Sequence, residues 1–386
     1  MKRHLLLVVG LALLSTSAFA TKARMESLGQ SGANGSFYLS DTRNVFRNAA
    51  LVNTTKNYVV TEWGSASATD ATATPEAEGG WFSEAGTFGY GVYLNNTQSA
   101  QVTHYTSLAT TSKNNDVNRT GYAAIGNKLD VFIGADMGFE WGVNVSISSF
   151  EDEGVSQAYK KEQSGMGVGF GVIMGDLDAY ANVGLKDEAK GGAAAGDKWE
   201  ATMGINAGAN YKLQGFTLFA DYKKGGVEET AAGVKTENNA TEMTVGAARV
   251  MEIASSGRWF YDLRWYNNKS EEKITAGTDE YKVTKIPLTL GFEADATSWL
   301  TLRGSISQSL KGSGEMNLAG SAPAATSNNK KTQNANTATV AAGATLNFGK
   351  LKVDGVMQTD GSNAYQSVGH LRTDDLMGRV SVHYWF

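Results

Sequence analysis

The chain lacks cysteine, has only 3 prolines in 386 residues and contains no long apolar run. Without cysteine there is no disulfide framework, so the fold must be held by its backbone hydrogen bonds. The longest apolar stretch, Leu5 to Leu14, is well short of the roughly 18 to 20 residues that a membrane-spanning helix needs. A helical membrane protein is therefore excluded, and any residence in a membrane must be through a β-barrel or surface contact.

Residues that carry chemistry are also scarce. The sequence has 4 histidines and contains no Gly-x-Ser-x-Gly elbow, no zinc-binding His-Glu-x-x-His motif and no phosphate loop. We therefore predict no catalytic residue, no metal site and no cofactor, and the chain is not expected to be an enzyme. The one enzymatic alternative is a loop pair of Asp374 or Asp116 with a histidine. The net charge of −5 argues against nucleic acid as a partner, which would favour a basic surface.

The start of the chain has the pattern of an export signal. A basic stretch, Met1 to His4, precedes the apolar run, and Ala18-Phe19-Ala20 supplies a small-x-small cleavage pattern. We predict a signal peptide over residues 1–20, cleavage after Ala20 and a mature chain that begins at Thr21.

Strand patterns fill most of the remaining chain. From residue 128 onward, apolar and polar side chains alternate over stretches of about 9 to 15 residues, which suits tilted membrane-spanning strands. Between Trp199 and Leu213, for example, Trp199 and the odd positions share an apolar face, while Lys198, Glu200 and the even positions share a polar one. The 45 glycines, 15 tyrosines and 8 tryptophans also favour a barrel over soluble domains.

The connections alternate between short turns, such as Gly175-Asp176 and Gln214-Gly215, and longer polar segments. The longer segments are 187–197, 226–239, 313–336 and 360–375. Short turns on one side and long loops on the other are typical of outer-membrane barrels, whose strand number is even because both ends lie on one side. We predict an all-β fold, a single transmembrane antiparallel β-barrel over residues 57–386, with about 14 strands and 16 as the alternative.

The two strand counts differ in how residues 57 to 127 are interpreted. An even total requires an odd number of strands there, and one strand gives fourteen whereas three give sixteen. The candidates are Tyr58 to Gly64, Thr87 to Asn95 and, as a weaker third, Val102 to Ala109.

The chain ends in an alternating strand with a terminal aromatic residue. Val382, Tyr384 and Phe386 share an apolar face, whereas Arg379 and His383 lie opposite. This pattern resembles the C-terminal signal by which bacterial outer-membrane β-barrels are recognised for assembly. We therefore expect the cell outer membrane as the location, with its lipids, lipopolysaccharide and the barrel-assembly machinery as partners; a homo-oligomer is left open.

Residues 21–56 do not alternate and are read as a separate N-terminal segment. Ala23 to Leu28 is expected to form a short helix closed by Gly29, and Asp41 is expected to cap a helical turn from Asn44 to Arg47. A helical segment ahead of a barrel either plugs the lumen or lies in the periplasm.

Two stretches carry a family resemblance: Leu28-Gly29, Asp41 and Asn48-Ala49-Ala50-Leu51, and then Phe132 to Val143. They resemble the long-chain fatty-acid channel superfamily of FadL type, which includes PorV-like proteins. Ala49 stands where that family has proline, which leaves the backbone angle φ of the turn less restricted. The resemblance implies a channel for hydrophobic compounds whose lumen is closed by the N-terminal segment. The plug residues it implies are Phe37, Asp41, Phe46, Arg47, Asn48, Ala50 and Leu51.

Charges of both signs fall on the predicted inner face of the barrel. The predicted lumen-lining residues are Glu140, Lys198, Glu200, Lys212, Asp221, Lys223, Arg258, Asp262, Arg264, Glu293, Arg303, Asp354 and Arg379. In an open lumen they would favour small hydrophilic solutes. In a plugged lumen they would pair with the N-terminal segment, which offers Lys22, Arg24, Glu26, Asp41, Arg43 and Arg47.

Three functions follow from these patterns. The leading hypothesis is a porin-like channel for passive diffusion of small solutes. The second is a channel for hydrophobic compounds such as long-chain fatty acids, with a ligand pocket near the plug lined by Phe37, Tyr38, Val45, Phe46 and Leu51. The third is a structural or adhesive outer-membrane protein.

Overall fold

The computed structural model describes most of the chain, namely residues 21–64, 77–96, 127–153, 160–191, 196–253, 256–274, 277–318, 330–332, 338–358 and 379–386. Most of these residues are in extended strands, and short helical turns occur near the start. No helix in this part of the chain is long and apolar enough to cross a membrane.

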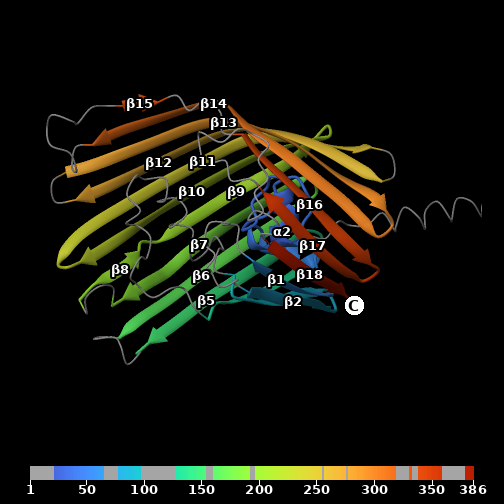
Figure 1. Ribbon diagram of the computed structural model, residues 1–386. Coiled ribbons are helices and arrows are strands. Elements are labelled where there is room, and N and C mark those ends of the chain that lie inside the picture. The colour runs from blue at the N-terminus through green and yellow to red at the C-terminus, as the bar shows by residue number, and fades with distance from the viewer. Residues whose placement is uncertain are drawn as a thin grey trace, which may run out of the picture.

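The strands form one closed antiparallel sheet (Figure 1). Neighbours in sequence pair with one another, and β1 pairs with β18 from Tyr58 opposite Trp385 to Gly64 opposite Arg379, so the described ring has no open edge. The strands are β1 (Tyr58–Gly64), β2 (Ala77–Ala85), β3 (Phe88–Leu94), β4 (Leu129–Asp136), β5 (Glu140–Asp152), β6 (Lys161–Met174), β7 (Leu177–Lys190), β8 (Lys198–Ala201), β9 (Gly204–Leu213), β10 (Phe216–Ala231), β11 (Val234–Ile253), β12 (Gly257–Ile274), β13 (Gly277–Thr297), β14 (Leu300–Leu318), β15 (Lys330–Thr332), β16 (Ala338–Phe348), β17 (Leu351–Gln358) and β18 (Arg379–Trp385).

Two of the eighteen strand segments share a position in the ring with another segment. β8 and β9 both lie between β7 and β10, and β15 and β16 both pair with β14. The described barrel therefore has eighteen less two, or sixteen, strand positions, which corrects the preferred count of fourteen and confirms the alternative. The missed strand is β2, whose glutamates and adjacent glycines hide its alternation. The third candidate, Val102 to Ala109, lies outside the described residues.

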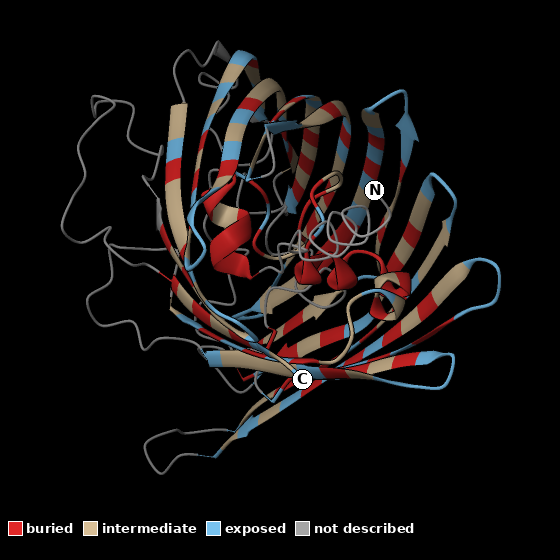
Figure 2. Cartoon of the chain, turned by 90° about the vertical axis from the view of Figure 1, so that its right-hand side faces the viewer, coloured by how far each residue is buried: buried red, intermediate tan, exposed pale blue. Residues whose placement is uncertain are grey.

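The two faces of the sheet differ in polarity. Outward side chains such as Leu263, Phe292 and Ile306 are large, apolar and exposed. Inward side chains are mostly buried and many are polar, and Figure 2 shows buried and exposed bands alternating along the strands. In β18, Tyr384 is exposed on the outside whereas His383 is fully buried on the inside. This distribution is the reverse of that in a soluble domain, which hides its apolar side chains.

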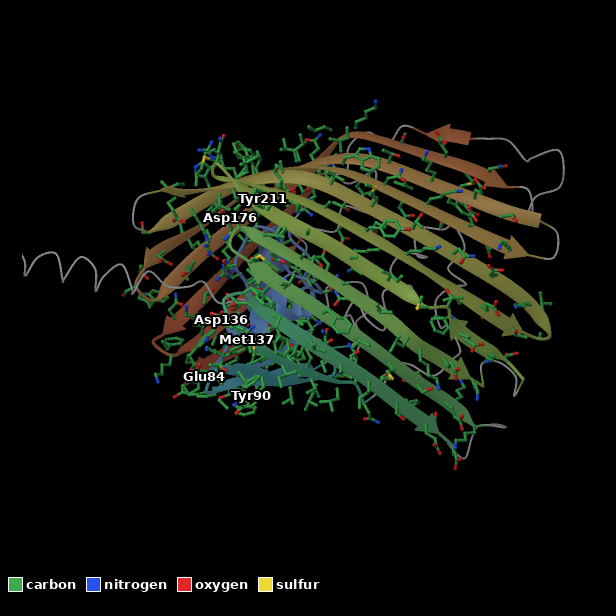
Figure 3. The ribbon with its side chains drawn as sticks, turned by 180° about the vertical axis from the view of Figure 1, so that it is seen from behind. Glu84, Tyr90, Asp136, Met137, Asp176 and Tyr211 are labelled. Atoms are coloured by element: carbon green, nitrogen blue, oxygen red, sulfur yellow. The ribbon has the colours of Figure 1, made fainter. Side chains whose placement is uncertain are left out.

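Strands β10 to β14 are longer than the alternation predicts, at 16 to 21 residues. Residues 226–239, expected as a long loop, form a hairpin around Ala232 and Gly233, whose φ angles are 50° and 79°. Two positive φ angles match the twist of a tight hairpin, so that loop prediction is wrong. The opposite end has the expected short turns, including Gly175-Asp176 and Gln214-Gly215. We call it the short-turn end; Figure 3 labels Asp176 there.

The N-terminal segment lies inside the ring (Figures 1 and 2). Its helical turns are α2 (Lys22–Ser27), η1 (Thr42–Phe46) and η2 (Ala49–Asn53). The side chains of Thr21, Asp41 and Asn48 each accept a hydrogen bond from a backbone N–H at the start of one turn. Gly29 ends the first turn with a φ of 65°, as expected. Ala49 begins η2, so this turn forms without the proline of the family pattern.

Glycines on the inner wall let η2 lie close to β5 and β6. A Cβ on Gly142 would overlap the carbonyl group of Ala49, and one on Gly171 would overlap the side chain of Asn48. Here the absence of a side chain is a requirement for packing.

Candidate functional site in the barrel lumen

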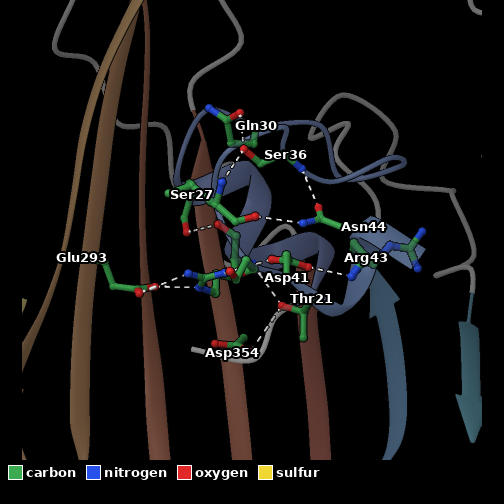
Figure 4. A network of polar contacts seen from close by, with 12 residues as sticks. Thr21, Ser27, Gln30, Ser36, Asp41, Arg43, Asn44, Glu293 and Asp354 are labelled. Atoms are coloured by element: carbon green, nitrogen blue, oxygen red, sulfur yellow. Dashed lines mark hydrogen bonds and ion pairs between the residues drawn. The ribbon is translucent and has the colours of Figure 1, made fainter. Parts of the chain in front are cut away.

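Arg24 of α2 is the centre of a buried ionic cluster between the N-terminal segment and the wall. Figure 4 labels three of its carboxylates, Asp41, Glu293 and Asp354. Its Nε and Nη2 donate to the carboxylate of Glu293 at 2.7 and 3.1 Å, and its Nη1 donates to Asp41 at 3.0 Å. Arg303 donates to Glu293 at 2.6 Å. The full cluster is Arg24, Arg258, Arg303, Asp41, Glu293 and Asp354. Its three guanidinium groups match its three carboxylates, which limits the cost of burying the charges.

A second cluster joins the segment to β1 and β2. Glu78 accepts from Lys22 Nζ at 2.5 Å and from Arg43 Nη1 at 3.0 Å, so two cations of the segment share one carboxylate of the wall. The hydroxyl of Tyr93 also donates to Glu78 at 2.9 Å. The backbone N–H of Lys22 donates to Glu62 of β1 at 3.1 Å.

Helix α2 thereby bridges the seam where the first and last strands meet. Thr21 donates to Asp354 of β17 at 3.3 Å, and Glu26 pairs with Arg379 of β18 at 3.1 Å. Together with the contacts of Lys22, one helical turn touches four consecutive strands of the ring, β17, β18, β1 and β2.

Aromatic stacking holds another side of the segment. Phe37 stacks on Phe219 of β10 with ring centroids 4.6 Å apart and nearly parallel planes, and the guanidinium carbon of Arg47 lies 4.7 Å from the centre of the Phe37 ring. Tyr38 packs on Phe260 of β12 at 5.6 Å. These aromatic members of the hypothetical ligand pocket therefore already have partners on the wall.

Most of the predicted lumen residues lie on the inner face. Those that lie inside and make polar contacts are Asp221, Lys223, Arg258, Asp262, Arg264, Glu293, Arg303, Asp354 and Arg379. Glu140 is on the same face at the short-turn end, and Lys212 is exposed at that rim. The implied plug residues are buried except Phe37 and Leu51, which are half-buried.

Lys198 and Glu200 are corrections to the predicted lumen face. Trp199 between them is fully buried against apolar side chains of β7, β10 and β11, so Lys198 and Glu200 point outward and pair with each other at 2.7 Å. The cause is the break between β8 and β9. From Ile205 back to Ala201 the chain advances four residues, whereas β10 opposite advances only three, from Lys224 to Val227. One extra residue moves every side chain of β8 to the opposite face of the sheet.

The sequence reasoning missed Glu62, Glu78 and Asp178 as wall residues of the site. Asp178 accepts a hydrogen bond from Asn48 Nδ2 at 2.5 Å. Glu62 occupies an inner position of the predicted strand Tyr58 to Gly64, so the alternation itself contained the signal for it.

Burial shifts the pKa values of Asp41 and Lys22 in the N-terminal segment. It raises the pKa of Asp41 to about 7, although nearby Arg24 opposes the change. It lowers the pKa of Lys22 to about 8, and the positive charge of Arg43 acts in the same direction. Loss of water penalises the charged form of both groups.

Chemistry other than ion pairing is sparse in the described part of the chain. No group of three or more His, Asp or Glu side chains there could hold a metal ion. His383 is the one histidine among the described residues, and its ring stacks on that of Tyr58 at 5.8 Å and lies tilted against that of Trp385 at 5.0 Å. The alternative loop pairs of Asp374 or Asp116 with a histidine lie outside the described residues.

Comparison with known proteins gives only distant likenesses. No family model matches the chain, and no curated protein matches it. Among solved structures, a mutant of the TodX monoaromatic hydrocarbon channel has a TM-score of 0.35 at 11% identity, covering 92% of this chain and 96% of its own. OmpT of Vibrio cholerae has a TM-score of 0.34 at 10% identity, covering 86% and 95%. A triple mutant of Rhodopseudomonas blastica porin has a TM-score of 0.31 at 11% identity, covering 85% and 98%. Similarity at this level says nothing about function. The barrel is established by the strand pairing of this chain itself.

Proposed function

We propose that the chain is an outer-membrane channel whose lumen is restricted by its N-terminal segment. The observation that carries the proposal is a closed ring, apolar outside and polar inside, that encloses residues 21–56. The exposed outer side chains would be unfavourable in water, at about 25 cal/mol for each Å² of apolar surface, whereas lipid would cover them. The signal peptide predicted over residues 1–20 would direct the chain to the same location.

The polar inner wall supports small hydrophilic solutes as cargo. Paired charges of both signs would create a transverse field across any water-filled path beside the segment. The buried ion pairs argue that the segment stays seated at rest, so we propose a restricted channel in place of a freely open porin. A hydrophobic cargo is less well supported because Phe37, Tyr38 and Phe46 already pack against aromatic rings of the wall.

Planar-bilayer recording tests this proposal. The wild-type protein is expected to give small or infrequent current steps, and a variant lacking residues 21–56 should give larger ones because the lumen is cleared. Both proteins are first checked for the altered gel mobility of an unheated, folded barrel. If both are folded and neither conducts, the chain is not a channel, and a structural role would replace it.

A further inference from the structure

An arginine occupies the outer face of the barrel at the short-turn end. The residues on either side of Arg249 in β11 face inward, since Ala248 is fully buried and Val250 packs against the interior cluster around Phe260. Arg249 therefore points outward. Its register partners are Phe216, the first residue of β10, and Tyr261 of β12.

The guanidinium group of Arg249 is held in place by its neighbours. Its central carbon lies 5.1 Å from the centre of the Phe216 ring, a cation–π contact. A Cβ built on Gly215 would be 3.9 Å from Arg249 Nε and 4.0 Å from Nη2, so the group rests against the Gln214-Gly215 turn. Trp259 and Tyr261 form a tilted aromatic pair at 5.9 Å beside it. The cation is thus fixed beside Phe216 and next to the Trp259–Tyr261 pair at the short-turn end.

Arg249 also lacks a counter-ion where one would be expected. Over the part of the chain that the structure describes, no carboxylate forms an ion pair with it, whereas Lys269, near the other end of the neighbouring strand, pairs with Glu271 at 2.6 Å. From Arg249 toward the middle of the strands, the outer face continues as exposed apolar side chains, including Leu218 and Leu263. The matching ligand would combine an anionic head with apolar tails.

We propose that Arg249 binds the phosphate of a phospholipid in the leaflet at the short-turn end. The inference rests on the proposed membrane location and adds a specific lipid site to it. A guanidinium group can donate two parallel hydrogen bonds to a phosphate while its plane stays stacked on Phe216, which an ammonium group cannot do. Aromatic residues at the membrane interface favour the same depth.

Native mass spectrometry of the detergent-purified full chain tests the site. The protein is titrated with phosphatidylglycerol and, separately, with a galactosyl diacylglycerol that has the same acyl chains and no phosphate. We expect Arg249→Gln to weaken the tightest phosphatidylglycerol adduct about tenfold, or about 1.4 kcal/mol, because the charge-assisted hydrogen bonds to the phosphate are lost. Arg249→Lys should recover part of that loss, and galactolipid binding should not change. Lys269→Gln, which removes an outward cation already paired, is the matched control.

Three outcomes decide the matter. Equal phosphatidylglycerol retention by wild type and Arg249→Gln overturns the site. Displacement of the adduct by millimolar inorganic phosphate also overturns the lipid assignment, because the acyl chains would then contribute nothing. Failure of the wild-type protein to float with phosphatidylglycerol vesicles refutes the membrane location itself, so the two proposals fail separately.

Discussion

Replacing Arg24 with methionine should unseat the N-terminal segment while leaving the barrel closed. Arg24 is fully buried, and its substitution removes the donors to Glu293 and Asp41 and leaves the cluster with one excess negative charge. Removing one partner of a buried ion pair costs about 3 to 5 kcal/mol. At about 1.4 kcal/mol for each factor of ten, the ratio of seated to released segment should fall by roughly a hundredfold to a few thousandfold. None of the barrel's strand pairs involves Arg24.

Two measurements report the release. Bilayer currents of Arg24→Met should become larger or more frequent than those of the wild type, and limited proteolysis should cut within residues 21–56 much faster. Arg258→Met is the matched control because Arg258 also donates to Glu293, at 3.1 Å, but belongs to β12 and makes no ion pair with the segment. That control should keep wild-type protection of the segment.

Charge balance supplies a rescue. Adding Asp41→Asn to Arg24→Met returns the cluster to two cations and two carboxylates, so the double variant should regain part of the protection lost in Arg24→Met alone. The reasoning is refuted if Arg24→Met, shown to be folded by gel mobility, keeps both the wild-type current and the wild-type resistance to protease.

Three further predictions concern the same segment. Burial raises the pKa of Asp41 from 3.8 to about 7, so the folded protein favours the protonated carboxyl. The stability that this protonation adds is complete below pH 3.8 and is lost as the pH rises through 7. The difference in the free energy of thermal unfolding between wild type and Asp41→Asn should therefore change by up to about 4 kcal/mol between those pH values. A difference that does not vary with pH would contradict the burial argument. Ala49→Pro should raise the free energy of unfolding by about 0.4 to 1 kcal/mol, because Ala49 is the first residue of η2 and Asn48 before it is extended; a loss of stability would refute this. Gly171→Val should displace η2 and lower the free energy of unfolding by about 1 to 3 kcal/mol. Gly355→Val, whose added Cβ would have nothing within 4 Å, should leave it unchanged. Protease cleavage within the segment should increase only in Gly171→Val.

Period-two alternation predicted the barrel because the two faces of each strand have different surroundings, apolar side chains outside and polar ones inside. In β12, Arg258, Asp262 and Arg264 lie inside and Trp259 lies outside, as the sequence pattern indicates. The pattern fails at Trp199, because a single extra residue between β8 and β9 reverses the phase and leaves no mark in the composition. It also fails at β2, where Gly79 and Gly80 are adjacent and the buried Phe82 directly follows the outward Trp81.

The cations of the site were visible in the sequence, but their partners were not. Arg24 and Lys22 stand in a segment that does not alternate, and each pairs with a carboxylate far along the chain, Glu293 and Glu78. Which wall residue comes level with which segment residue depends on the stagger between successive strands. That stagger is set by all the strand pairs together, so no local stretch of sequence encodes it.

The seam between β1 and β18 has a consequence for the order of folding. Its register pairs Tyr58 with Trp385, so the ring can close only after the final residues have been made, and loop closure over such a distance is slow. The segment is the first part of the described chain to be synthesised, but the ion pair between Glu26 and Arg379 can form only after β18 has been synthesised. The contact of the segment with the last strand can therefore form only when the ring closes. A chain truncated before Arg379 should stall as an open sheet that presents two unpaired edges.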